Sequence, residues 1–145
     1  MKIGISSDHN GVKVKKNIIK YLKQLGHETV DFGTDSTLSV DYPEYAFKVG
    51  KALGKEIEIG ILICGTGIGM SIAANKVKGV RCALVHDVSE AKLAKMHNNA
   101  NILALSSKMN MFRVKDILDA FINTNFSEIE RHKRRIDMID NYNDN

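Results

Sequence analysis

Short apolar runs alternate with amphipathic stretches along the whole chain, and many of the runs end in Gly, Ser, Asp or Thr. This rhythm is typical of a β–α–β fold, in which helices connect parallel strands. The run at 59–64 is apolar almost without interruption, as expected of a strand that is covered on both faces, and the runs at 81–86 and 101–106 repeat it. Together with the runs at 3–7 and 29–32, the pattern predicts five strands.

The amphipathic stretches predict a helix after each strand. The first helix is expected at 12–25, with Gly26 as its C-cap. The second begins near Tyr42, because Pro43 fits the first turn of a helix, where its missing N–H would have no partner. The helices are expected at 12–25, 42–54, 71–77, 89–98 and 112–123. The sequence therefore predicts an α/β fold, a Rossmann-like three-layer sandwich with a five-stranded parallel sheet and an extra C-terminal helix.

The C-terminal helix, at about 127–142, carries few apolar residues, namely Ile129, Ile136, Met138 and Ile139. Two interpretations are open: the segment 127–145 docks on a partner subunit, or it is a loosely packed terminal helix. The length of 145 residues and the hydrophobic content of 43% fit a single domain over 1–145.

Composition excludes several classes of protein. The N-terminus reaches the polar segment 6–8 after a few apolar residues, so neither a signal peptide nor a membrane span fits, and we expect a cytoplasmic protein without membrane contact. Cys64 and Cys82 lack the paired spacing of a zinc site or a redox dithiol, so no metal is expected.

The net charge of +4 is unevenly distributed. The basic residues gather in two places, Lys13, Lys15 and Lys16 near the N-terminus and Arg131, Lys133, Arg134 and Arg135 near the C-terminus. No nucleic-acid-binding motif accompanies them, and aromatic residues make up only 6% of the chain. A small phosphorylated ligand therefore suits this charge better than a nucleic acid.

The turn Gly65-Thr66-Gly67-Ile68-Gly69 lies between a buried strand and a helix. Its glycines let backbone N–H groups converge, so the turn is expected to bind an anion. It is neither the dinucleotide-binding fingerprint, since Met70 stands where the third glycine belongs, nor a P-loop, since no Gly-Lys-Ser/Thr follows. The alternative is a tight turn with no ligand.

Cys64 comes directly before this turn, where oriented N–H groups and a helix N-terminus favour the thiolate, which could act as a base. The alternative is a small buried apolar residue, the usual state of a free cysteine. For Cys82, which lies within an apolar strand without a polar neighbour, that second interpretation is preferred.

Ligands of open parallel sheets bind beyond the carboxyl ends of the strands, where Asp8 and His9 lie, although Asp8 could simply cap the next helix. His97 ends a predicted helix, where it could cap carbonyls or move a proton. Arg131 and Arg135 are spaced i,i+4 and could hold a phosphate together or form a solvated surface.

In this combination and order, the motifs resemble those of the B-type ribose-5-phosphate isomerase family, which includes the subunits of galactose-6-phosphate isomerase. The resemblance covers essentially the whole chain. It rests on Ser7-Asp8-His9-Asn10-Gly11, Asp41-Tyr42-Pro43, the stretch from Ile63 to Gly69 with Ala73-Ala74-Asn75-Lys76, His97-Asn98-Asn99 and Arg131-His132-Lys133-Arg134-Arg135.

The resemblance implies a role for each of these residues. Cys64 is the base that removes the C2 proton of the opened aldose, and Thr66 supports it. The enediolate is then held by Gly65, Thr66, Gly67, Ile68 and Gly69. In the other branch of the family the base is a glutamate further along the turn, where this chain has Ser71 and Ile72.

The remaining roles concern the sugar ring and the phosphate. His97, with Asp8 nearby, matches the position that opens the ring, and Asp8 and Asn98 match substrate-binding positions. The phosphate ligands would be His9, Arg131, Arg135 and Lys108. The family commonly has arginine where Lys108 stands, so the charge is kept and the bidentate fork is lost.

The implied activity is the interconversion of D-ribose 5-phosphate and D-ribulose 5-phosphate in the pentose phosphate pathway, without metal or cofactor. Family members are dimers with shared active sites, so a homodimer is expected, with a tetramer as a further option. One alternative is an isomerase of a six-carbon phosphosugar, allose 6-phosphate or galactose 6-phosphate. The other is a non-catalytic phosphosugar- or nucleotide-binding module.

Overall fold

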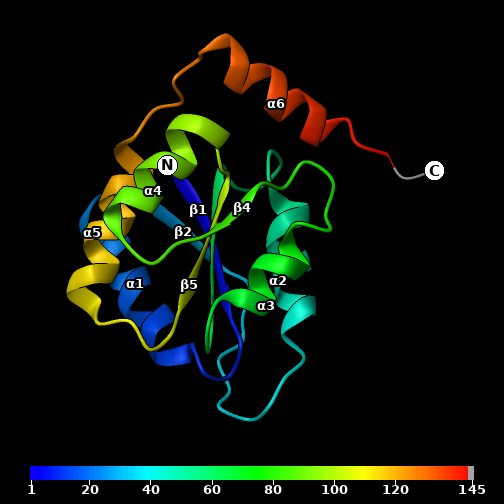
Figure 1. The fold of residues 1–145 in the computed structure, drawn as a ribbon. Coiled ribbons are helices and arrows are strands. Elements are labelled where there is room, and N and C mark those ends of the chain that lie inside the picture. The colour runs from blue at the N-terminus through cyan, green and yellow to red at the C-terminus, as the bar shows by residue number, and fades with distance from the viewer. Residues whose placement is uncertain (144–145) are drawn as a thin grey trace.

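Five parallel strands form one sheet in the order β2-β1-β3-β5-β4 in the computed structural model, which describes residues 1–143 (Figure 1). The strands are β1 (Lys2–Ser7), β2 (Glu28–Asp31), β3 (Ile59–Cys64), β4 (Cys82–Leu84) and β5 (Ile102–Ser106). The helices are α1 (Val12–Gln24), α2 (Tyr42–Ala52), α3 (Ile68–Ala74), α4 (Val88–Asn98), α5 (Met111–Asn123) and α6 (Glu130–Asp140). This arrangement confirms the predicted α/β fold class.

The sheet is the middle layer of the sandwich (Figure 1). The helices α1, α4 and α5 cover one face, and α2 and α3 cover the other. Every residue of the central strand β3 is buried, because Ile59, Ile61 and Ile63 face the first layer whereas Leu62 and Cys64 face the second. The end of β3, where Cys64 lies, is thus held from both sides.

Several elements differ from the sequence prediction; α6, for example, begins at Glu130 rather than near residue 127. The helix expected at 71–77 begins at Ile68 and ends at Ala74, because Gly67 turns directly into the helix through a left-handed conformation (φ 79°). The strand expected at 81–86 spans only Cys82–Leu84 and is half-buried rather than covered on both faces. It is the last strand of the sheet and pairs only with β5, so apolar residues there do not indicate a central strand.

The helix α6 crosses the end of the sheet at which the strands begin (Figure 1). Only His132 and Ile136 of this helix are buried, whereas Met138 and Ile139 are exposed. Its C-terminal end is held by an ion pair between Arg81 and Asp140. Of the segment predicted at 127–145, residues 144 and 145 lie outside the described part of the chain. Within residues 1–143, no helix is long and apolar enough to cross a membrane.

Candidate active site

Cys64 ends the central strand with its sulfur beside the turn that follows. The residue is 5% exposed, and the Gly67 N–H donates a hydrogen bond of 3.2 Å to Cys64 Sγ. The backbone around it is fixed by both neighbouring strands, since Asp8 N donates to Ile63 O and Ser107 N to Cys64 O. A backbone donor aimed at the sulfur stabilises negative charge there, as a thiolate base requires.

The turn after Cys64 needs a glycine at position 67. Gly67 has φ 79°, and a Cβ added there would lie 2.6 Å from Leu84 Cδ1 and 3.0 Å from the Leu105 carbonyl carbon. Within the turn, Ile68 N donates to Thr66 Oγ1 at 3.2 Å, and Ser106 Oγ donates to Gly65 O at 2.8 Å. These bonds tie the turn to itself and to β5.

Tyr42 packs against the candidate site, a position that sequence reasoning did not predict. A Cβ on Gly69 would lie 2.5 Å from Tyr42 Cζ and 2.7 Å from its Oη, so the phenol ring packs directly on the glycine turn. The sequence placed Tyr42 at the start of a helix and within the motif Asp41-Tyr42-Pro43, but gave it no role in the site. The available signal was the pairing of a bulky aromatic with a glycine, but these residues are far apart in the chain.

Asp8 and His9 follow β1, beside the end of β3. The Asp8 carboxylate is buried and accepts a hydrogen bond from Asn10 N at 2.9 Å; the N-cap of α1 is Gly11, so Asp8 does not cap that helix. His9 is half-buried, and its Nδ1 accepts from Val40 N at 3.3 Å. This bond leaves Nε2 of His9 as the nitrogen free to face a ligand.

Lys15 is buried, unlike the other basic residues near the N-terminus. Its side chain is fully buried, and Nζ donates to Asp31 Oδ1 (2.8 Å), Thr34 O (2.6 Å) and Asp35 Oδ1 (3.0 Å). All three ammonium protons are therefore used, and the charge anchors the segment after β2. That segment continues to Val40, which contacts His9. The sequence offered no sign that this lysine is internal.

A second group of predicted site residues lies at the C-terminal end of α4 and on α6. The rings of His97 and His132 lie 4.4 Å apart between centroids, at 38°. His132 is buried and hydrogen-bonded through Nδ1 to Ser127 Oγ at 2.8 Å. Burial, and then the charges of His97, Arg131 and Arg135, lower the pKa of His132. Neither His97 nor Asn98 is buried.

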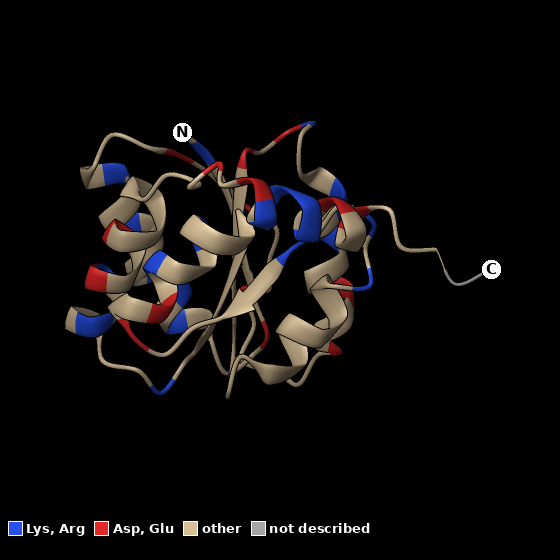
Figure 2. Ribbon diagram, turned by 45° about the horizontal axis from the view of Figure 1, so that its top comes forward, with Lys and Arg blue, Asp and Glu red and all other residues tan. Residues whose placement is uncertain are grey.

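Arg131 and Arg135 are exposed on α6, where several basic residues follow one another (Figure 2). Lys108 is also exposed, but it follows β5 at the other end of the sheet, near Ser106. The structure thus keeps the predicted arginine pair on one helix and separates it from Lys108.

The two groups lie at opposite ends of the sheet within one chain. Asn98 O accepts a hydrogen bond from Arg81, which lies next to the start of β4. At that point Cys82 of β4 is in register with Ile102 of β5, and Ile102 is in register with Gly60 of β3. Cys64 is four residues further along β3, or about 13 Å at the rise of a parallel strand. Figure 1 shows the same separation, with α6 at the end opposite the loop between β2 and α2. One protomer does not bring His97 to Asp8 or Cys64.

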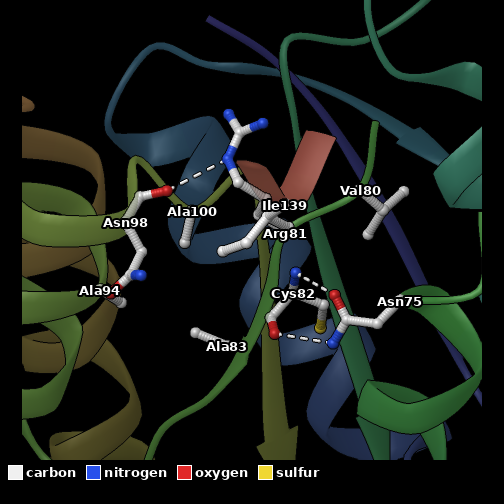
Figure 3. A pocket seen from close by; sticks show the side chains of 9 residues that line it. All are labelled: Asn75, Val80, Arg81, Cys82, Ala83, Ala94, Asn98, Ala100 and Ile139. Atoms are coloured by element: carbon white, nitrogen blue, oxygen red, sulfur yellow. Dashed lines mark hydrogen bonds between the residues drawn. The ribbon is translucent and has the colours of Figure 1, made fainter. Parts of the chain in front are cut away.

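Cys82 lies away from Cys64 and the glycine turn, at the end of the sheet where Asn98 lies. It lines a cavity of about 300 Å³ between the start of β4, the end of α4 and α6 (Figure 3). Burial raises the pKa of the Cys82 thiol to about 12, although a hydrogen bond with Ser71 opposes the shift. Cys82 is therefore a neutral thiol near pH 7, whereas Cys64 has a donor on its sulfur.

A family profile described as Ribose/Galactose Isomerase matches residues 3–139. Ribose-5-phosphate isomerase B of Mycobacterium leprae is 39% identical over 142 residues, which cover 96% of this chain and 88% of that protein. The solved structure of a ribose 5-phosphate isomerase from Thermotoga maritima has 47% identity and a TM-score of 0.93, with 97% of this chain and 98% of that chain covered. Ribose-5-phosphate isomerase B from Mycoplasma genitalium, solved with bound ribulose-5-phosphate, has 44% identity and a TM-score of 0.92, with 97% and 95% covered.

Proposed function

Because this chain belongs to the ribose/galactose isomerase family, we propose that it interconverts D-ribose 5-phosphate and D-ribulose 5-phosphate. The observation that carries the proposal is the Cys64 sulfur, buried at the end of β3 with the Gly67 N–H donating to it. Relatives named ribose-5-phosphate isomerase B match the chain over nearly its full length, and one of them was solved with the ketose product.

In the proposed reaction the Cys64 thiolate takes the proton from C2 of the open aldose, and the C–H electron pair forms the C1–C2 double bond of an enediolate. As this double bond forms, the C1 carbonyl pair moves onto O1. The thiol then returns the proton to C1 and becomes the thiolate again, the C2 hydroxyl proton passes to O1, and the C2 oxygen becomes the ketone of the product. Charge develops on oxygen only during this step. Backbone donors of the turn from Gly65 to Gly69 that are already fixed in place stabilise it without reorganisation.

The other predicted residues serve the two ends of the sugar. His97 and Asp8 exchange a proton with the ring oxygen, and Asn98 binds a hydroxyl group. His9, Arg131, Arg135 and Lys108 hold the phosphate. Arginine suits this task because its planar fork binds two phosphate oxygens at once, whereas Lys108 acts as a point charge.

The separation of these residues within one chain supports a homodimer with shared active sites. His97, Asn98, Arg131 and Arg135 lie at the end of the sheet opposite Cys64, so a second copy has to supply one of the two groups. Large apolar residues are exposed near both groups, including Ile68 and Ile72 on α3 and Leu93 and Met96 on α4. A twofold pairing that buries these faces completes two identical sites. A tetramer and a cytoplasmic location stay predictions.

A mixing experiment tests the shared site. Cys64→Ala and His97→Asn are each expected to be inactive as pure dimers, because both sites of each dimer lack one group. When equal amounts are unfolded and refolded together, half of the dimers pair one variant with the other and carry one intact site, so about 25% of wild-type activity returns. Activity that stays at the level of the separate variants would contradict the shared site.

A coupled assay that offers five- and six-carbon aldose phosphates side by side tests the substrate. The proposal predicts that kcat/KM is highest for ribose 5-phosphate. A higher kcat/KM for allose 6-phosphate or galactose 6-phosphate would assign the same chemistry to a hexose phosphate. No turnover of any sugar phosphate would indicate a binding module.

A further inference from the structure

Arg81 connects three separate elements at the end of the sheet that carries α6. Its Nη1 donates to both Asp140 carboxylate oxygens, at 2.9 and 2.8 Å, on the last residue of α6. Its Nε donates to the carbonyls of Asn98 (3.1 Å) and Asn99 (3.3 Å), and Nη2 donates to Asn99 O at 3.0 Å. The Arg81 backbone is fixed in turn, since its N–H donates to Asn101 Oδ1 at 2.8 Å. Figure 3 shows the guanidinium reaching Asn98 above the cavity.

The two carbonyls belong to the end of α4, directly after His97. Asn99 is the C-cap of this helix and has a left-handed conformation (φ 43°). The terminal carbonyls of a helix need donors from outside the helix, and here the arginine fork supplies them. The position of His97 and Asn98 is therefore tied to Arg81.

The helix α6 has few other attachments. Its buried residues are His132 and Ile136, and its apolar residues near the C-terminus are exposed. Arg81–Asp140 is an ion pair between side chains that are 15% and 34% exposed, in which Nη1 alone contacts both carboxylate oxygens while the other two guanidinium nitrogens contact the end of α4. Arg131 and Arg135 lie on the helix that this pair holds.

We propose that Arg81 is a positioning residue, which fixes the spacing between the ring-opening His97–Asn98 end of α4 and the phosphate-binding arginines of α6 through its fork on Asn98, Asn99 and Asp140. This inference rests on the proposed function, because His97 and the two arginines have their roles only there. The bonds of Arg81 to Asn98, Asn99 and Asp140 keep the end of α4 and the arginines of α6 at a constant distance. The bound sugar has to span this distance between its ring oxygen and its phosphate.

The variant Asp140→Asn separates the contact of Arg81 with α6 from its contact with the end of α4. It removes the charged anchor on α6 but leaves the carbonyls of Asn98 and Asn99 in place. We expect KM for ribose 5-phosphate and the inhibition constant of inorganic phosphate to rise about fivefold, as for loss of a partly exposed ion pair, while kcat stays within about twofold. The matched control is Asp137→Asn, which removes the same charge from the same helix at an exposed carboxylate that has no ion pair within residues 1–143. Its KM is expected to be unchanged.

The variant Arg81→Lys keeps the charge and loses the fork, so it disturbs both anchors. We expect kcat to fall about tenfold and KM to rise about as much as in Asp140→Asn. Adding Asp140→Asn to Arg81→Lys should raise KM by less than the same change does in the wild type, because both changes weaken the same contact. A purely structural role predicts something else: a lower Tm and a smaller active fraction, with unchanged KM in the molecules that remain folded.

The outcomes separate this inference from the proposed function. Equal KM and equal phosphate inhibition in Asp140→Asn and Asp137→Asn, in an enzyme that isomerises ribose 5-phosphate, would overturn the role of Arg81 alone. A wild-type protein that binds inorganic phosphate by calorimetry but isomerises no sugar would overturn the proposed function. The phosphate affinities of the same two variants would then still decide whether Arg81 positions α6.

Discussion

At the scale of single residues, His132 couples the stability of the fold to pH. Its pKa is lowered from 6.5, first by burial and then by the neighbouring charges of His97, Arg131 and Arg135. The unfolded chain therefore binds this proton more readily than the folded chain, so stability rises with pH in this window. The contribution is complete above pH 6.5 and is lost as the pH falls through the lowered value.

The variant His132→Asn should reduce this dependence. We expect the free energy of unfolding of the wild type, measured with urea between pH 8 and 5, to fall toward acid more steeply than that of the variant. Equal slopes for the two proteins between pH 7 and 5 would contradict the account of His132.

Gly67 is the residue on which the conformation of the turn depends. In Gly67→Ala the left-handed φ costs about 1 kcal/mol, and the contacts with Leu84 and the Leu105 backbone add a similar amount, so the free energy of unfolding should fall by about 2 kcal/mol. Gly79→Ala is the control, because Gly79 has φ 84° but open space around its Cα. Denaturant unfolding of both variants measures the difference, and equal losses would show that the crowding at Gly67 has no cost.

At the scale of elements, the segment after β2 is held by one buried ammonium. Lys15→Met would leave Asp31 and Asp35 without their partner, but both carboxylates can still reach water, since they are 33% and 73% exposed. We therefore expect a loss of about 2 kcal/mol in unfolding free energy, less than for a fully buried pair. Because the segment also carries the Val40 contact to His9, KM should rise as well.

The control for Lys15 is Lys13→Met, which makes the same change at an exposed position of the same helix. It should leave both unfolding free energy and KM close to wild type. If Lys13→Met and Lys15→Met behave alike in both measurements, the buried cluster does not hold the segment.

Most elements could be predicted from the sequence, because apolar periodicity and caps are local signals. Pro43 correctly marked the start of α2, and the continuous apolar run at 59–64 correctly marked a strand that is covered on both faces. One error was at β4, whose place at the edge of the sheet depends on strand order. Others were at the starts of two helices: α3 begins three residues earlier than predicted, after the left-handed Gly67, and α6 begins three residues later. Neither strand order nor the exact entry into a helix is a local property.

The candidate site was predicted only in part for the same reason. Cys64 and the glycine turn adjoin in sequence, so their geometry could be anticipated. The contacts of Tyr42 with Gly69, and of Arg81 with Asp140, join residues that are far apart in the chain. Lys15 resembled its exposed neighbours in sequence but is completely buried. Such residues can be found only from tertiary structure.

At the scale of the whole molecule, the fold distributes the predicted chemistry over both ends of one sheet. The proton-transfer group around Cys64 lies where the strands end, and His97 with the arginines of α6 lies where they begin (Figure 1). A parallel sheet forces this separation, because each helix returns the chain to the opposite end. Under the proposed function, two copies have to combine to complete a site, with the basic surface of α6 facing the pocket of the partner rather than that of its own chain.

The most direct test of the account is exchange of the C2 proton of ribose 5-phosphate in deuterated water, followed by proton NMR. Cys64→Ala should bind the sugar phosphate with unchanged affinity in calorimetry but exchange the C2 proton at least about a hundredfold more slowly than wild type, the contribution expected of a general base. Cys82→Ala, which removes a neutral thiol far from Cys64 and the glycine turn, should exchange at the wild-type rate. Wild-type exchange in Cys64→Ala would contradict the central claim that this thiolate is the base.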